Sequence, residues 1–192
     1  LNNVFAQRVL KERDENGIRI LERFNAHQAT VWGMNAEGKA VFSKWFSLQS
    51  GLTVQRSEYK DAVEWDEDAP AEKKFLRTPN VYGYFTMQSS PIKRLSIALS
   101  GNYNGRMLVG HAAGSGVEKP VAVHTPSFFT LSLKASYDFD IYKQVKAQLN
   151  AGIQNIGNVY QRDLDKGWNR DASYIYGPSL PRCFYVGLKL MY

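Results

Sequence analysis

The chain has 192 residues, enough for one domain or for part of a larger one, with 44% hydrophobic residues and a net charge of +6. This composition excludes a disordered chain, and no stretch approaches the ~20 consecutive apolar residues of a membrane-spanning helix. The single cysteine, Cys183, excludes an intramolecular disulfide and a cysteine-based zinc site. The basic residues of the chain are scattered along the sequence and form no basic stripe, so we expect no nucleic-acid partner.

The elements that the sequence predicts are all strands, because apolar and polar residues alternate with period two. In residues 94–104, for example, Leu95, Ile97 and Leu99 share one face. Strands are expected over about 1–10, 20–42, 45–60, 79–89, 94–108, 127–140, 144–157 and 181–192. No helical segment competes with them. The prediction is therefore an all-β fold, an antiparallel up-and-down meander of about eight strands.

The expected connections alternate strictly between short and long along the chain. The short ones lie near 43–44, 90–93 and 140–143. The long ones cover about 11–19, 61–78, 109–126 and 158–180. A meander places all short turns at one end and all long loops at the other. Outer-membrane barrels have this asymmetry, with short periplasmic turns and long extracellular loops.

Alternation alone also fits a soluble ligand-binding barrel, whose apolar residues point inward. The polar faces here, however, carry mainly Ser, Thr, Gln and Asn, whereas the water-exposed face of a soluble protein usually carries more charged residues. Aromatic residues stand near strand ends, as in the pairs Phe129 and Tyr137 or Phe184 and Tyr192. Eight residues of strand span ~26 Å, which fits aromatic girdles beside an apolar band about 25 Å tall. This favours a transmembrane barrel with lipid-facing positions Ile97, Leu99, Leu131, Leu133, Leu149 and Leu188.

The end of the sequence resembles the C-terminal part of the β-barrel of a TonB-dependent outer-membrane receptor. The stretch QLNAGIQNIGNVYQRD (148–163) is similar to the family's penultimate strand and following turn, through Asn155, Ile156, Asn158 and Tyr160. In SYIYGPSLPRCFYVGLKLMY (173–192), a G-x-P-x-x-P-R-like element is formed by Gly177, Pro178, Pro181 and Arg182. The last strand resembles the outer-membrane assembly signal, through Tyr185, Gly187, Leu190 and Tyr192.

The resemblance implies that residues 1–192 are about the last eight strands of a barrel of about 22 strands, without its plug domain and earlier strands. The chain begins with LNNVF, with neither an initiator Met nor a signal peptide, and this also favours a fragment or a processed product. A self-standing small outer-membrane structural barrel is the structural alternative.

The function that the resemblance implies is import of a scarce nutrient, such as a ferric chelate, cobalamin or an oligosaccharide. It implies a place in the outer membrane of a Gram-negative bacterium, in contact with its lipid. The implied partners are the TonB complex, acting through the absent plug, the barrel-assembly machinery and the small-molecule nutrient.

No catalytic motif is present, so we expect no enzyme, no cofactor and no metal site. Binding usually resides in long loops on a rigid rim. The richest candidate is the last loop, where Trp168, Arg170, Tyr174 and Tyr176 suit contact with a ligand. They suit anchoring at a membrane surface equally well. We expect His111 and His124, which flank another loop, to be ordinary solvated residues.

Overall fold

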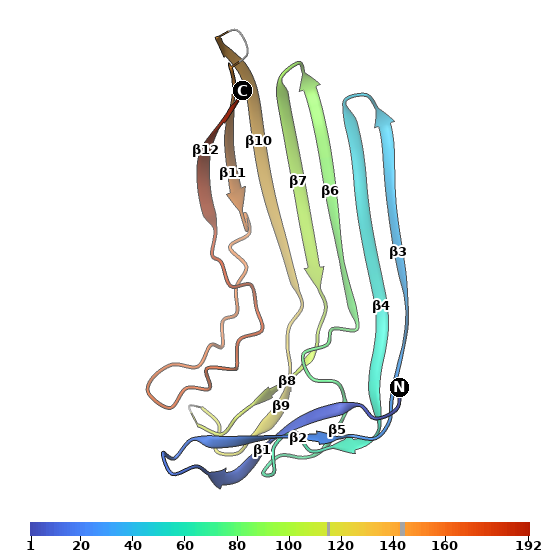
Figure 1. Ribbon diagram of the computed structural model, residues 1–192, viewed down its shortest axis with the longest axis vertical. Helices are drawn as coiled ribbons and strands as arrows, with labels where there is room; N and C mark the ends of the chain where they lie inside the picture. Colours follow the sequence, from blue (N-terminus) through green and yellow to red (C-terminus); the bar gives the residue numbers. More distant parts are fainter. Residues whose placement is uncertain (115, 143–144) are drawn as a thin grey trace.

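The computed structural model describes residues 1–114, 116–142 and 145–192, and these form strands and connections without a helix (Figure 1). An antiparallel sheet of eight strands, here called the wall sheet, dominates the molecule, in the order β12-β11-β10-β7-β6-β4-β3 with β5 paired to β4. Its strands are β3 (Ala29–Ser43), β4 (Phe46–Val63), β5 (Glu72–Lys74), β6 (Val81–Ile92), β7 (Leu95–Asn104), β10 (Phe128–Tyr142), β11 (Val145–Gln154) and β12 (Cys183–Met191). The predicted all-β antiparallel meander of about eight strands is confirmed. No helix among the described residues could span a membrane.

Two hairpins lie outside the wall sheet. One pairs β1 (Phe5–Arg13) with β2 (Arg19–Asn25), and the other pairs β8 (Leu108–His111) with β9 (Val121–His124). The prediction of a wall strand at 1–10 and of one continuous strand over 20–42 was therefore wrong. The chain breaks between β2 and β3, where His27 adopts a φ of 63° and its N–H donates to Asn25 Oδ1 at 2.8 Å. This break turns β2 back onto β1 instead of into the wall.

The predicted alternation of short and long connections holds within the wall sheet, but the connection predicted to be long at about 11–19 is a tight hairpin turn between β1 and β2, in which the N–H of Asp14 donates to the carbonyl of Ile18. Tight turns join β3 to β4 and β6 to β7 at one end, while the long connections and both hairpins gather at the other (Figure 1). The predicted short turn at 140–143 reaches residue 143, which lies outside the described residues. The N-terminus lies at the loop end and the C-terminus at the end of the short turns.

The register of the wall sheet separates apolar from polar side chains, because directly opposed residues of antiparallel strands point to the same side. One transverse row consists of Ala40, Leu48, Met87, Leu99, Leu133, Ile153 and Phe184. The adjacent row, on the other side, consists of Lys39, Gln49, Thr86, Ser100 and Ser132. We call these two sides the apolar face and the polar face. All six positions predicted to face lipid lie on the apolar face.

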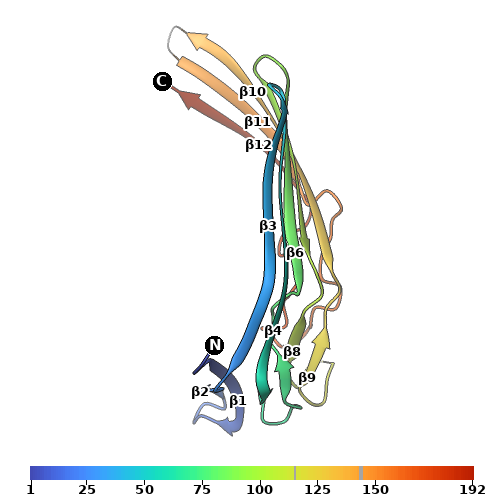
Figure 2. The same ribbon diagram turned by 90° about the vertical axis from the view of Figure 1, so that its right-hand side faces the viewer.

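The wall sheet is a single curved layer with no core of its own (Figure 2). On its apolar face, Leu188 is 63% exposed and Met34 is 71% exposed. The buried apolar residues concentrate instead near the loop end, where Leu108 and Val109 of β8 and Phe128 at the start of β10 are enclosed. Among the described residues, β3 and β12 each pair with only one neighbouring strand, so the sheet is open at both edges.

Several glycines in the wall lie directly beneath an aromatic ring of the neighbouring strand. Gly152 of β11 is opposite Tyr185 of β12, and Gly101 of β7 is opposite Phe85 of β6. A Cβ atom at Gly152 would stand 2.5 Å from the Tyr185 ring and 2.7 Å from the carbonyl oxygen of Leu133. Only glycine allows this close approach. These pairs fix the register, because a slip of one residue would drive each ring onto a side chain.

Candidate functional site

The long connections pack into one unit, which we call the loop assembly. It comprises the described residues of 1–28, 64–80, 105–127 and 155–182, except for β5, which belongs to the wall sheet. Val9 in β1 donates its N–H to the Trp65 carbonyl at 3.1 Å, and Val9 accepts from the N–H of Glu67 at the same distance. Arg77 donates to the carbonyls of Ser173 and Ile175 in the last loop. The connections, far apart in sequence, are thus joined by backbone and guanidinium hydrogen bonds.

A buried cluster between β8 and the last loop forms the centre of the loop assembly. His111 Nε2 lies 2.9 Å from Asp165 Oδ2, and both side chains are more than nine-tenths buried. The Tyr174 ring stacks on the imidazole with 3.8 Å between ring centroids. The backbone N–H of Asp171 also donates to Asp165 Oδ2, at 2.9 Å. His111 is therefore a buried residue that holds the last loop, and the expectation of a solvated histidine was wrong.

Two tyrosine hydroxyls converge on Asp163. Tyr174 donates to Oδ2 at 3.0 Å and Tyr176 donates to Oδ1 at 2.5 Å. Burial alone would raise the pKa of Asp163, but the hydrogen bonds from Tyr176 and Tyr174 outweigh it and the net effect lowers this pKa. Burial and the bond to Asp163 raise the pKa of Tyr174 to about 12. Near neutral pH, Asp163 therefore remains an anion, and the Tyr174 hydroxyl remains protonated and able to donate its hydrogen bond.

Asparagine and glutamine side chains hold the base of the last loop. Asn155 and Asn158 both adopt a φ of 49°, a conformation that asparagine tolerates better than most residues. Asn155 Nδ2 donates to the carbonyls of Val159 and Leu180, at 2.8 and 2.9 Å. Gln161, which is 4% exposed, accepts from the N–H of Tyr176 at 2.9 Å. Asn155 and Asn158, which belong to the sequence element that resembles the TonB-dependent receptors, thus have a local physical role in closing the loop.

The four residues predicted to contact a ligand do not converge on one surface. Tyr174 is 3% exposed and stacks on His111, so its ring has no free face for a ligand. Trp168 is fully exposed. Tyr176 lines a hollow of about 400 Å³ together with Phe128. Arg170 lines a different pocket, described next.

A polar pocket of about 560 Å³ lies between the β1–β2 hairpin, the segment after β8 and the last loop. We call it the arginine pocket, because Arg13, Arg19 and Arg170 line it. Arg19 Nη2 donates to the Ala113 carbonyl at 3.0 Å, and Arg13 Nη1 donates to the Gly17 carbonyl at 2.7 Å. Sequence reasoning did not find Arg13 and Arg19, because the first hairpin was assigned to the wall and no local pattern links it to the last loop.

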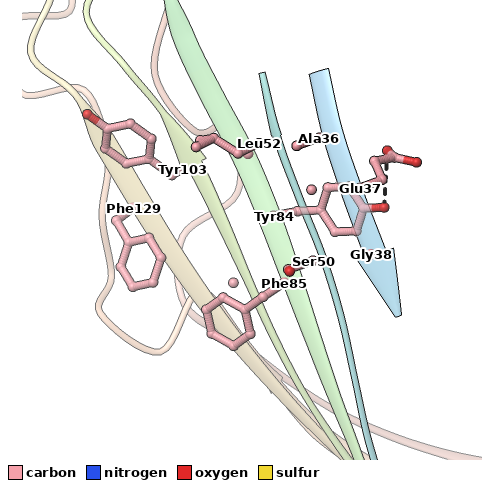
Figure 3. A pocket seen from close by; sticks show the side chains of 12 residues that line it. Ala36, Glu37, Gly38, Ser50, Leu52, Tyr84, Phe85, Tyr103 and Phe129 are labelled. Carbon is pink, nitrogen blue, oxygen red and sulfur yellow. Dashed lines mark hydrogen bonds between the residues drawn. The ribbon is translucent and has the colours of Figure 1, made fainter. Parts of the chain in front are cut away.

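A second hollow, of about 580 Å³, lies on the wall sheet (Figure 3). Most of its lining belongs to the apolar face, where the small residues Gly83 and Gly101 lie among Leu52, Phe85 and Phe129. The Tyr84 hydroxyl donates to Glu37 Oε1 at 3.3 Å, and by register both residues belong to the polar face. Since no set of polar groups converges in this hollow, we interpret it as an indentation left by small side chains.

The residues of the predicted assembly signal end the wall sheet. Tyr185 and Gly187 lie on the polar face of β12, Leu190 lies on the apolar face, and Tyr192 follows the strand with 98% exposure. Their recognition by the assembly machinery stays a prediction. Among the described residues, no group of three His, Cys, Asp or Glu side chains could hold a metal ion.

Comparisons of sequence found no protein-family model and no curated protein that matches the chain. Solved structures do match its fold. The ferric-catecholate import receptor Fiu from E. coli K12 covers 96% of this chain with a TM-score of 0.59 and 17% identity, and a mutant of the ferric enterobactin receptor PfeA from Pseudomonas aeruginosa covers 97% with a TM-score of 0.62 and 15% identity. The ferripyoverdine receptor of the outer membrane of P. aeruginosa covers 78% with a TM-score of 0.51 and 13% identity.

The chain spans 24%, 27% and 18% of the lengths of Fiu, PfeA and the ferripyoverdine receptor, respectively. At these identities the likeness concerns the fold. The chain has the fold of a segment of the β-barrel of these outer-membrane receptors, as its resemblance to TonB-dependent receptors predicted.

Proposed function

We propose that the chain supplies barrel wall and outward loops to an active transporter of the outer membrane, of the TonB-dependent kind, that imports a ferric chelate. The observation that carries this proposal is the exposed apolar face of the wall sheet. Soluble monomers rarely expose a continuous apolar patch larger than a few hundred Å². Here such side chains continue across the strands from Met34 in β3 to Leu190 in β12, and Leu190 is 63% exposed.

The height of the apolar face supports a membrane as its partner. On β4 this face carries Phe46, Leu48, Ser50, Leu52 and Val54, and then turns charged with Arg56, Glu58 and Lys60. Nine residues from Phe46 to Val54 span ~30 Å of strand, or ~23 Å of depth at a tilt of about 40°. This agrees with an apolar band about 25 Å tall.

A ferric chelate is the proposed substrate because the fold neighbours are receptors for such ligands: ferric catecholate, ferric enterobactin and ferripyoverdine. Cobalamin and oligosaccharides have no comparable support. In this proposal residues 1–192 are about the last eight strands of the barrel, and the TonB complex acts through a plug domain elsewhere in the full-length protein. Loop residues Trp168, Arg170 and Tyr176 are the proposed ligand contacts.

Uptake of radioactive iron in an iron-starved host tests the proposal. We expect that deletion of the gene abolishes uptake of at least one ferric chelate, that the wild-type gene restores it, and that a protonophore blocks it. Radiolabelled cobalamin serves as the control substrate and should enter equally with or without the gene. Equal iron uptake from every chelate with and without the gene would contradict the proposal.

A further inference from the structure

We propose that Asp163, Tyr174 and Tyr176 form a site that coordinates a small trivalent cation directly, with Fe³⁺ as the ion that the donors suit best. One donor comes from the beginning of the last loop and two come from its end. The inference goes beyond the proposed function, because here the protein itself, and not a chelator, supplies the oxygen atoms that bind the metal.

The donor atoms already have the spacing that a small octahedral cation requires. Tyr176 Oη lies 2.5 Å from Asp163 Oδ1, and Tyr174 Oη lies 3.0 Å from Asp163 Oδ2. Neighbouring oxygens around an octahedral ion with bonds of about 2.0–2.1 Å lie about 2.9 Å apart. The two tyrosine rings meet edge to face with 5.3 Å between centroids. An ion that takes the place of the two hydroxyl protons therefore requires only small shifts of the three side chains.

The surrounding groups fix the two tyrosines in this arrangement. The Tyr174 ring stacks on His111, and the Tyr176 ring lies 6.0 Å from the Phe128 ring between centroids. Gln161 Nε2 donates to the Tyr174 carbonyl at 3.1 Å, and its Oε1 accepts the N–H of Tyr176 at 2.9 Å. Metal ligands that are held by such neighbours lose little freedom when an ion binds. Tyr174 has no free ring face, but a cation needs only its hydroxyl oxygen.

The balance of charge selects a trivalent ion. Coordination releases the two hydroxyl protons to water and leaves one carboxylate and two phenolates, whose three negative charges one trivalent cation neutralises. A divalent ion would leave a net negative charge close to the buried Asp165 carboxylate, which acts electrostatically on Tyr174. Phenolate and carboxylate oxygens are hard donors, and hard donors favour a hard cation such as Fe³⁺.

The site borders the hollow of about 400 Å³ at the base of the last loop. Asp163 and Tyr176 line this hollow together with Tyr160 and Arg162. Asp163 is also exposed, so an ion can reach the carboxylate from the hollow. Water, or the oxygen atoms of a weak carrier in the hollow, would complete the coordination of the ion.

Visible absorption spectroscopy on the full-length protein in detergent tests the inference, because tyrosinate bound to Fe³⁺ gives a charge-transfer band that iron bound by carboxylates alone lacks. The probe is ferric nitrilotriacetate, a weak carrier that leaves positions on the ion open. The variants are Tyr176→Phe and Asp163→Asn, which each remove one donor and keep the shape of the side chain. The matched control is Tyr160→Phe, which removes the hydroxyl of a 50% exposed tyrosine in the same hollow. Heat-modifiable gel mobility verifies that each variant is folded.

We expect the wild type to develop the band as iron is added, up to one ion per protein. Tyr176→Phe and Asp163→Asn should weaken iron binding at least about tenfold, since even the loss of a group that only supports a metal ligand costs about 10–100-fold. Tyr160→Phe should bind iron like the wild type. Gallium nitrilotriacetate, with an ion of the same charge, should displace the iron and remove the band, whereas Ca²⁺ at the same concentration should not.

Three results would overturn the site. The first is no charge-transfer band from the wild type. The second is a band of wild-type strength and affinity from Tyr176→Phe. The third is equal displacement of the iron by Ca²⁺ and Ga³⁺, which would remove the argument from charge. Uptake of ferric chelates is measured separately, so each of these results leaves the proposed import of iron standing.

Discussion

Large apolar side chains point outward from the wall sheet, where Leu188 is 63% exposed, but are enclosed in the loop assembly, where Val109 is 0% exposed. The strands of the wall sheet are held together by backbone hydrogen bonds and by aromatic rings that pack over glycines of the neighbouring strand. The loop assembly is held by side chains, such as Asp163, Asp165 and Asp171, that accept several hydrogen bonds each. One chain therefore uses two kinds of stabilisation: backbone ladders with outward apolar side chains in the wall sheet, and buried polar networks in the loop assembly.

The strongest test of the difference between the two regions is to place a charge on the apolar face of the wall sheet. Leu99→Arg in the full-length protein should cost about 2–4 kcal/mol near the bilayer midplane and strongly reduce the folded population in the outer membrane. Ser100→Arg, one residue away on the polar face, should be tolerated. Heat-modifiable gel mobility of membrane fractions measures both. Similar behaviour of the two variants would remove the distinction between the faces.

A smaller effect is expected at the end of the wall. Tyr192 is 98% exposed, so Tyr192→Ser removes almost no packing within the described residues. If the assembly machinery recognises the ring, the variant should be present in the outer membrane at a fraction of the wild-type amount. The purified variant and the purified wild type should have the same melting temperature. Immunoblots of membrane fractions give the amount. An unchanged amount would make the terminal ring dispensable for assembly.

The glycines beneath aromatic rings allow a test confined to the wall. Gly152→Ala should destabilise the sheet by about 1–3 kcal/mol, the usual cost of overpacking, because its Cβ would press on the Tyr185 ring and the Leu133 carbonyl. Gly38→Ala places its Cβ in open space and serves as the control. Urea unfolding in detergent compares them. Equal stabilities would mean that the strands adjust without cost.

In the loop assembly the expected effect is local and depends on pH. The pKa of Asp163 in the folded state lies below its ordinary value of 3.8. Its contribution is therefore fully present above about pH 4 and is lost as the pH falls through the lowered pKa. Hydrogen exchange of residues 158–180, corrected for intrinsic rates, should quicken in that acid range. In Asp163→Asn it should already be faster at neutral pH, whereas Asp61→Asn should match the wild type throughout.

The wall could be predicted from the sequence and the loop assembly could not, for one physical reason. Alternation such as that of Leu131 and Leu133 against Ser132 is a local property, so it is readable from a few residues. The stacking of Tyr174 on His111, or the lining of one pocket by both Arg13 and Arg170, depends on contacts between segments far apart in sequence. The first hairpin was misplaced for the same reason, because β1 alternates like a wall strand but pairs with β2 and not with a strand of the wall sheet.

The length of β4 has a consequence for where a ligand is first met. This strand runs for 18 residues, and its apolar part ends at Val54. The remaining stretch to Val63 adds about 20 Å of height above the apolar band at ordinary rise and tilt. In a barrel that spans the outer membrane, as proposed above, the loop assembly would stand on a rim well clear of the bilayer surface and in contact with the outside medium. A solute could reach the arginines without approaching the hydrocarbon, and the ionic strength of the surroundings would set the range over which they attract it.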